Sequence, residues 1–332
     1  MQTSDHPTSP VLSPASIGVA AVLTGAALFA VNGTVSKMVL EAGMSSLRLV
    51  EIRCAAAAAA FFLITALSRP SSLRIGVREL GFVVVYGITG IAFVQWLYLV
   101  AIARMPVSLA LLIEYTAPLL VALWVRFARR GEVRARVWAA LVLSFGGLAI
   151  VAEVWQGVTL DGVGVLAAGA AAVSLAAYYL LGERGLGRRD PLSLSAWGFT
   201  AAAGFWSLLL PWWSFPFDLM DDRVAVDLLG TTAPVWALVI WVVLLGTVAP
   251  FGLSLFGIGK IGATRTGLIG TAEPVLAGLV AWIVIDEVLT GWQLAGACVV
   301  LAGIVLAETS RPAPAETPTE AEAEAVAVVV PS

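Results

Sequence analysis

Two glutamates lie inside long apolar stretches of this sequence, and each stands close to a proline. Glu114 precedes Pro118 by four residues, and Glu273 directly precedes Pro274. A carboxylate within hydrocarbon costs about 2.5–3.5 kcal/mol on insertion scales. It is therefore expected to face a cavity, to pair with a cation or to take up a proton. The two acids predict a polar site that can bind an ammonium group or exchange protons.

The prolines add free backbone carbonyl groups to the same region. A proline within a helix donates no backbone hydrogen bond and leaves the carbonyl four residues earlier without its partner. For Pro118 that carbonyl belongs to Glu114, and for Pro274 it belongs to Gly270. Such a carbonyl is tolerated at depth only against protein or water, where it can accept a hydrogen bond from a substrate ammonium group. In the alternative interpretation, the acids bond neighbouring helix ends and the prolines only kink the helices.

Other polar residues in apolar stretches are candidates for the same site. They are Asn32, Arg53, Gln95 and Tyr115. Arg48 lies three residues before Glu51 and can pair with it on one helix face, which leaves Arg53 without a partner. Arg53 then meets a substrate carboxylate, or its side chain extends to the membrane surface. Asn32 either lines the site or bonds a neighbouring helix.

The composition places these residues in a membrane protein. Hydrophobic residues form 60% of the 332 residues and charged residues 12%, beyond the range of a soluble domain. The apolar residues come in runs of about 20, the length of helix that crosses ~30 Å of hydrocarbon. Ten spans are expected, at 16–37, 46–67, 79–101, 107–127, 135–155, 161–182, 193–212, 234–257, 264–285 and 290–308.

An internal repeat organises these spans. Residues 102–153 and 258–308 share a basic residue, a helix with an acid and a proline, a turn and a final helix. We expect each stretch to close a unit of five helices, at 16–155 and 156–309. An odd number of crossings inverts the second unit relative to the first, a common arrangement in solute transporters. The expected fold is all-α, with ten transmembrane helices as two inverted five-helix repeats.

Basic residues collect in alternate connections between the apolar runs. One set holds Arg69, Arg74, Arg78, Arg126, Arg129, Arg130, Arg134, Arg136, Arg184, Arg188, Arg189, Lys260, Arg265 and Arg311. The other set holds Lys37, Arg48, Arg104 and Arg223. The positive-inside bias places the first set and both termini in the cytoplasm. Residues 1–15 and the acidic, proline-rich residues 310–332 are expected to be disordered tails.

Several other functions are disfavoured. The net charge of −3 gives no reason to expect a nucleic-acid partner. The glycines at 257, 259 and 262 match G-x-G-x-x-G, but the flanks are apolar spans, so a short cytoplasmic turn is expected instead of a dinucleotide site. No P-loop, H-E-x-x-H or G-x-S-x-G motif is present, and Cys54 and Cys298 have no metal-ligand spacing. We therefore expect no cofactor, no metal and no enzyme activity.

The same residues resemble a known family. The segment from Leu109 to Leu119, the glutamate–proline pair at 273–274 with Thr264-Arg265-Thr266-Gly267 before it, and Thr247-Val248-Ala249-Pro250-Phe251 are similar to EamA-type transporters of the drug/metabolite transporter superfamily. Within it they are most similar to bacterial exporters of threonine and homoserine. The resemblance covers residues 16–308. It implies ten helices in two five-helix repeats, with Asn32 near the substrate cavity.

The sequence therefore predicts a secondary active exporter in the bacterial cytoplasmic membrane. A small zwitterionic solute, an amino acid or related metabolite, would bind midway through the membrane and be released by alternating access. Proton exchange or the substrate gradient would drive it. Drugs and other metabolites are the alternative substrates. A channel would need a continuous polar pore, and a membrane-embedded enzyme would need a cluster of nucleophile, base or metal ligands.

Overall fold

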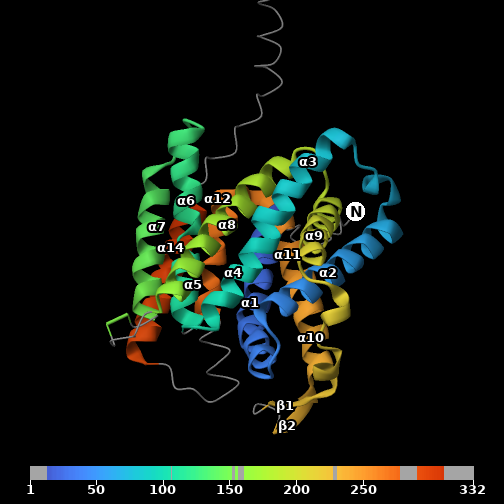
Figure 1. The fold of residues 1–332 in the computed structure, drawn as a ribbon. Coiled ribbons are helices and arrows are strands. Elements are labelled where there is room, and N and C mark those ends of the chain that lie inside the picture. Colours follow the sequence, from blue (N-terminus) through green and yellow to red (C-terminus); the bar gives the residue numbers. More distant parts are fainter. Residues whose placement is uncertain are drawn as a thin grey trace, which may run out of the picture.

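The protein is almost wholly helical in the computed structural model, which describes residues 13–105, 107–151, 154–155, 161–226, 230–276 and 290–309 (Figure 1). Among these residues, seven helices are long and apolar enough to cross a membrane. They are Pro14–Glu41, Ser46–Ser68, Val77–Ile102, Ala110–Ala128, Gly162–Leu186, Pro191–Leu209 and Val235–Ile261. Two shorter apolar helices, Ala135–Ile150 and Leu294–Leu306, coincide with two further expected spans.

The first half of the chain contains α1 to α7. Their bounds are α1 Pro14–Glu41, α2 Ser46–Ser68, α3 Val77–Val85, α4 Phe93–Ile102, α5 Val107–Glu114, α6 Ala117–Leu123 and α7 Ala135–Val151. The π-helical stretch η2 (Tyr86–Ala92) joins α3 to α4, and a second one, η3 (Trp124–Ala128), extends α6. A short 3₁₀ turn, η1 (Pro70–Leu73), follows α2.

The second half repeats this order. Its helices are α8 Gly162–Leu186, α9 Pro191–Leu209, α10 Val235–Val243, α11 Ala249–Ile261, α12 Ala263–Gly270 and α14 Gly291–Thr309. The π-helical stretch η7 (Leu244–Val248) joins α10 to α11. The expected span 264–285 is described only as far as residue 276. The expected tails lie outside the described residues, except that α1 already begins at Pro14.

The connection between α9 and α10 departs from an all-α fold. It contains the 3₁₀ turns η4 (Trp212–Ser214) and η5 (Phe217–Asp221). An antiparallel pair of strands follows, β1 (Arg223–Val226) and β2 (Thr231–Pro234), with Val224 opposite Ala233. The β-branched valines and threonines in these strands favour the extended backbone. Because they stand between two long apolar runs, the span pattern gave no sign of them.

Polar side chains fix where several helices begin. The Ser13 hydroxyl accepts a hydrogen bond from the Ser16 amide, and the Ser45 hydroxyl accepts one from Arg48. Asp161 caps α8 through Gly164, and Asp190 caps α9 through Leu192 and Ser193. A side chain that accepts a free amide at a helix start stabilises the helix by ~1 kcal/mol. Capping by Ser13 also explains why α1 begins two residues before the expected span.

Helices from the two halves pack against one another in reciprocal pairs. α1 packs along α11 and α8 along α4, while α2 packs along α9 and α7 along α14. In the order of helices, α8 of the second half corresponds to α1 of the first, and α11 corresponds to α4. The α1–α11 and α8–α4 contacts are therefore equivalent contacts between corresponding helices. The α7–α14 contact is close because Gly147 and Gly303 lie in it; a Cβ on Gly147 would lie 2.7 Å from Val300. Small residues allow such close approach between membrane helices.

The glycine-rich stretch before α12 is helical, which corrects the prediction of a turn there. Gly257 and Gly259 lie in the last turns of α11, which continues to Ile261. Gly262 alone in this stretch has the positive φ, 82°, that ends the helix. A Cβ on Gly257 would overlap Val22 of α1. Gly257 therefore serves the close packing of α1 on α11, and Gly259 faces Leu186 of α8.

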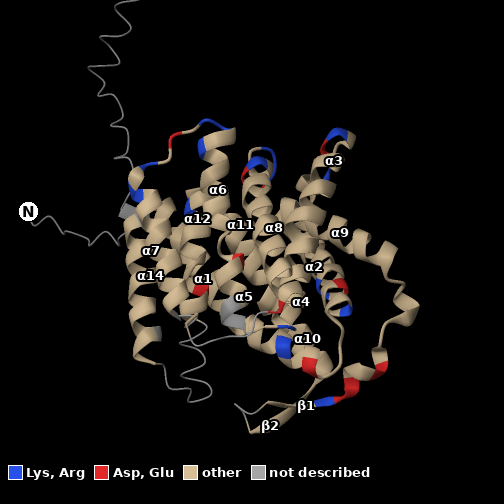
Figure 2. Ribbon diagram, turned by 60° about the vertical axis from the view of Figure 1, so that its left-hand side comes forward, with Lys and Arg blue, Asp and Glu red and all other residues tan. Residues whose placement is uncertain are grey.

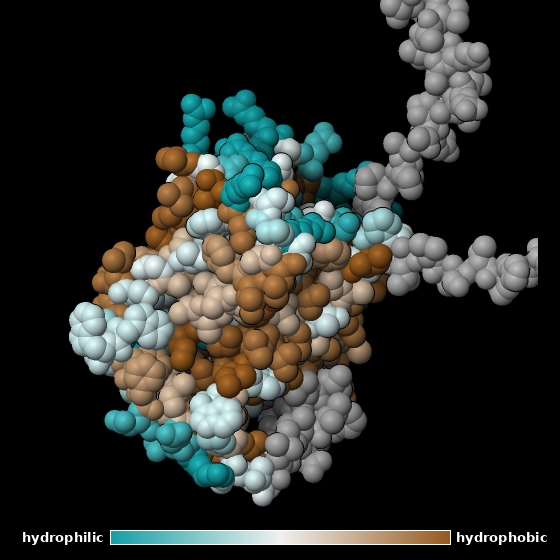
Figure 3. Space-filling model, turned by 90° about the vertical axis from the view of Figure 1, so that its right-hand side faces the viewer, coloured by the Kyte–Doolittle hydropathy of each residue, from teal (hydrophilic) through white to brown (hydrophobic). Residues whose placement is uncertain are grey.

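The surface has the distribution expected for a membrane protein. A broad band of hydrophobic residues crosses the middle of the molecule, with hydrophilic residues above and below it (Figure 3). Exposed apolar side chains include Leu67, Val142, Leu166, Leu208 and Val305. Lys and Arg gather at the end that holds the start of α3, the end of α8 and the end of α6 (Figure 2).

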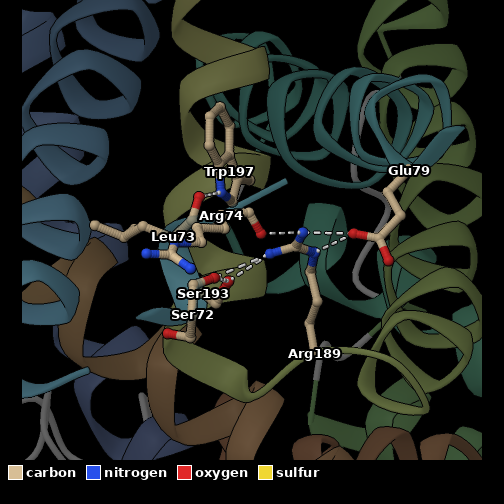
Figure 4. Close-up of polar contacts among 7 residues, drawn as sticks. All are labelled: Ser72, Leu73, Arg74, Glu79, Arg189, Ser193 and Trp197. Carbon is tan, nitrogen blue, oxygen red and sulfur yellow. Dashed lines mark hydrogen bonds and ion pairs between the residues drawn. The ribbon is translucent and has the colours of Figure 1, made fainter. Parts of the chain in front are cut away.

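The α2–α9 pair is tied at both ends by arginines. Near the start of α9, Arg189 bonds Glu79, the carbonyls of Ser72 and Arg74 and the Ser193 hydroxyl (Figure 4). Those contacts use all of the N–H donors of its guanidinium group. At the opposite end, Arg48 bonds Glu51 at 2.7 Å, the Pro211 carbonyl and the Ser214 hydroxyl. The predicted pairing of Arg48 with Glu51 is confirmed.

Candidate functional site

A cavity of about 90 Å³ lies between the two halves of the molecule. It is lined from α1, α4 and α5 of the first half and by the corresponding α8, α11 and α12 of the second, with one residue from α2. The polar residues singled out in the sequence all line it: Asn32, Arg53, Gln95, Glu114, Tyr115 and Glu273. A space of this volume with polar walls can hold several water molecules.

Tyr115 connects the two halves across this cavity. Its hydroxyl donates a hydrogen bond of 2.5 Å to Glu273 Oε2. Tyr115 lies in the interruption between α5 and α6, and Glu273 lies just beyond the end of α12. Both interruptions have the same internal bond: Thr116 Oγ1 donates to the Ile113 carbonyl and Thr271 Oγ1 to the Leu268 carbonyl. The interruptions precede Pro118 and Pro274, as the loss of a proline amide requires.

Glu114 is buried and has room for a ligand. Its side chain is 8% exposed. Among the residues that the structure describes, Glu114 has no hydrogen-bond or ion-pair partner. Glu273, from the other half of the chain, lines the same cavity. Two buried acids that repel each other favour a bound cation or an added proton.

Arg53 faces the cavity from α2. Its Nε donates to Thr247 Oγ1 at 3.0 Å and its Nη2 to the Gly246 carbonyl at 3.3 Å. Nη1 is buried and has no partner within the described part of the chain. The residue is 2% exposed, which excludes an extension of its side chain to the membrane surface. The Nη1 end of a buried guanidinium group is thus left for an anion.

Asn32 and Gln95 complete the polar lining. Asn32 lines the cavity, and its Oδ1 accepts a hydrogen bond of 3.2 Å from Ser36 in the same helix. Gln95 Nε2 donates to the Ile91 carbonyl at 3.3 Å, and its Oε1 has no partner among the described residues. Arg53 and Gln95 thus both line the cavity, and among the described residues each has one buried polar atom without a partner, Nη1 and Oε1 respectively.

Sequence reasoning missed most of the aromatic wall of the cavity. The wall consists of Phe29, Tyr98, Tyr178, Tyr179 and Phe251. The Phe29 and Phe251 rings meet edge to face at 5.3 Å, and Tyr178 meets Phe251 at 5.4 Å. Tyr178 also donates to the Phe251 carbonyl. An aromatic residue in an apolar run has the same sequence signature whether it faces lipid or a cavity, so periodicity gave no signal for these positions.

Comparisons with known proteins identify the family. Residues 16–152 and 162–309 each match the EamA-like transporter family. An "Uncharacterized transporter" of Archaeoglobus fulgidus is 27% identical over 293 residues, which cover 87% of this chain and 96% of that protein. The "Threonine/homoserine exporter RhtA" of Salmonella typhimurium is 26% identical over 244 residues, 72% of this chain and 75% of that protein.

A solved crystal structure has the same fold. It aligns with a TM-score of 0.65 and 20% identity, over 87% of this chain and 96% of that chain. The seven long apolar helices make the protein a multi-pass membrane protein. The two family matches confirm the resemblance seen in the sequence. The chain belongs to the EamA-like transporter family.

Proposed function

We propose that the protein is a secondary active transporter that exports a small amino acid or related metabolite through the bacterial cytoplasmic membrane. One observation carries this proposal: a buried cavity between the two halves holds two carboxyl groups, Glu114 and Glu273, together with the guanidinium group of Arg53. Relatives that are 25–26% identical carry the name threonine/homoserine exporter. A small zwitterionic amino acid fits this combination of charges.

The charges of the cavity are complementary to a zwitterion. Glu114 lacks a partner among the described residues, and Arg53 keeps Nη1 unpaired. A buried charge without a partner is costly. A ligand with an ammonium group and a carboxylate would pair with Glu114 through the first and with Arg53 through the second. Glu273 Oε2 accepts a hydrogen bond from the Tyr115 hydroxyl. Proton exchange at Glu114 or Glu273, or the substrate gradient alone, supplies the energy.

Alternating access would follow from two inverted five-helix units, residues 16–155 and 156–309, with ten transmembrane helices in all. The reciprocal packing of α1 on α11 and α8 on α4 supports a two-fold relation between the units. The gathering of basic residues at one end supports a cytoplasmic location of both termini. Labelling of single cysteines placed in each connection, from each side of the membrane, tests this arrangement. Termini on opposite sides would contradict it.

An organic amine or drug is the second substrate class. The aromatic wall of the cavity favours it, because aromatic faces attract organic cations, and Phe29, Phe251 and Tyr178 line the same cavity as the acids. A simple amine would be held by Glu114 and the rings and would leave Arg53 unused. Competition between L-threonine and its amide against one labelled substrate separates the two classes.

The test of the proposed function is transport in proteoliposomes that contain the purified protein. We expect saturable uptake of labelled L-threonine, accelerated when unlabelled L-threonine is present inside the vesicles. Such counterflow requires a carrier that exposes one site alternately to each side. A channel would give flux without saturation or counterflow. Chemical conversion of the substrate without translocation would indicate an enzyme and contradict the proposal.

A further inference from the structure

The π-helical stretch η7 lies directly against Arg53. Within it, Thr247 Oγ1 donates to the Val242 carbonyl, five residues earlier, at 2.8 Å. The same hydroxyl oxygen accepts the hydrogen bond from Arg53 Nε at 3.0 Å. Thr247 is fully buried. Its hydroxyl is thus fixed in direction by its own helix, and it can offer only a lone pair to the guanidinium group. π-helical turns of this kind frequently occur at functional sites.

Gly246 supplies the second contact. Its carbonyl accepts the bond from Arg53 Nη2 at 3.3 Å. A side chain at this position is excluded, because a Cβ on Gly246 would overlap Asn32 of α1. Asn32 is in turn bonded to Ser36. Glycine at 246 therefore lets α1, α2 and η7 meet at one point and brings a backbone carbonyl within reach of the guanidinium group.

Two of the three guanidinium nitrogens are therefore occupied by η7, and the third, Nη1, is left unpaired. Nη1 is buried and belongs to a residue that lines the cavity. A planar guanidinium group held at two nitrogens cannot rotate without the loss of both bonds. Its free edge has a fixed direction, and a carboxylate is the partner that this geometry binds best.

The other half of the molecule contains a similar arrangement. The stretch η2 supplies the Ile91 carbonyl to Gln95 Nε2, which leaves Gln95 Oε1 unpaired at the same cavity. Both π-helical stretches begin after nine residues of helix, α3 and α10 respectively. Each thus holds one polar side chain in place by a backbone carbonyl within a membrane span. Gln95 is held from within its own span, whereas Arg53 is held from another helix, and in both cases a π-helical carbonyl holds a side chain that lines the cavity.

We propose that Thr247 and Gly246 are positioning residues that direct Nη1 of Arg53 at the carboxylate of the substrate. The site would then select solutes with a carboxylate over the corresponding amides or amines. This inference rests on the proposed function, because it names the group by which the same cavity recognises its substrate. Thr247 and Gly246 do not touch the substrate themselves.

The test compares L-threonine with L-threoninamide, which has the same shape but no carboxylate. Counterflow gives the KM of L-threonine, and inhibition of that counterflow gives the Ki of the amide. For Thr247→Val we expect the KM of L-threonine to rise roughly tenfold, the effect of one charged hydrogen bond, with kcat little changed. The Ki of the amide should stay the same. Thr247→Ser, which keeps the hydroxyl group, should restore the KM.

Thr89→Val is the matched control. Thr89 lies in η2, and its hydroxyl bonds the Val85 carbonyl without contact to Arg53. This variant should leave both constants unchanged. If Thr247→Val does not fold, Thr247→Ala replaces it. Equal losses for the acid and the amide, or no loss for either, would overturn the inference alone. A wild-type protein that transports neither compound would contradict the proposed function and the inference together.

Discussion

The Tyr115 hydroxyl and the Glu273 carboxyl group are 2.5 Å apart and come from opposite halves of the chain. Tyr115 lies in the interruption between α5 and Pro118, and Glu273 lies directly before Pro274 in the helical residues 272–276, which follow the interruption after α12. The contact therefore joins the two proline-containing segments at the cavity. A movement of one half against the other that separates these two residues would break this bond.

We expect Tyr115→Phe to reduce transport of L-threonine roughly tenfold, because the charged form of Glu273 loses one hydrogen-bond donor. The fold should remain intact, since the ring is retained. Initial rates in proteoliposomes measure the effect. Tyr86→Phe is the control: Tyr86 is equally buried but does not line the cavity. Unchanged rates for Tyr115→Phe would remove this bond from the transport cycle.

Arg189 should contribute to stability. Its guanidinium group makes five hydrogen bonds that connect the start of α9 with the residues after α2. Arg189→Ala leaves Glu79 and the Arg74 carbonyl without their donor, while the Ser72 carbonyl keeps its bond from the Ser193 hydroxyl. We expect a loss of about 2–3 kcal/mol in the free energy of unfolding. Thermal denaturation in detergent measures the change.

Lys37→Ala is the control for the Arg189 variant. Lys37 and Glu41 are 4.0 Å apart, and both side chains are about half exposed or more. Such a pair contributes about 0–1 kcal/mol, so the denaturation midpoint should hardly move. A similar midpoint for Lys37→Ala and Arg189→Ala would contradict a special role for the Arg189 contacts.

Two adjacent glycines in α7 should respond in opposite ways to alanine. A Cβ on Gly147 would lie 2.7 Å from the Val300 amide and 2.8 Å from the Gly296 carbonyl of α14, whereas nothing lies within 4 Å of a Cβ on Gly146. Gly147→Ala should destabilise the protein by about 1–3 kcal/mol, because backbone atoms cannot move aside. Gly146→Ala should stabilise it by about 0.5–1 kcal/mol. Thermal denaturation of both variants in detergent measures the two changes. A shift of both midpoints in the same direction would contradict this prediction.

The sequence predicted the seven long apolar helices of the described residues, because the thickness of hydrocarbon sets their length. It did not predict the interruptions at η2 and η7. A π-helical turn depends on one inserted residue in the backbone hydrogen bonds, and an apolar run looks the same with or without it. The turn expected around Gly257 proved to be helix for a related reason. Glycine in a membrane helix often serves close packing, as Gly257 does against Val22.

The polar residues of the cavity were predictable because a polar side chain within a membrane span is rare and costly. That reasoning reached Glu114, Glu273 and Arg53, which the structure brings to one cavity. It did not reach Thr247, since a threonine is tolerated in any membrane helix. The partner of Arg53 could not be predicted either. It lies 194 positions away in the sequence, and only the packing of α2 against η7 brings the two together.

The most direct test of the account is proton-coupled transport by the Glu114→Gln variant. Glutamine keeps the size of the side chain but neither carries a charge nor exchanges a proton. Efflux of L-threonine from proteoliposomes is measured with and without an imposed pH gradient, with Glu41→Gln, an exposed acid at the end of α1, as control. We predict that Glu114→Gln loses transport or its response to the gradient. Full and still proton-coupled transport in this variant would contradict the role assigned to Glu114.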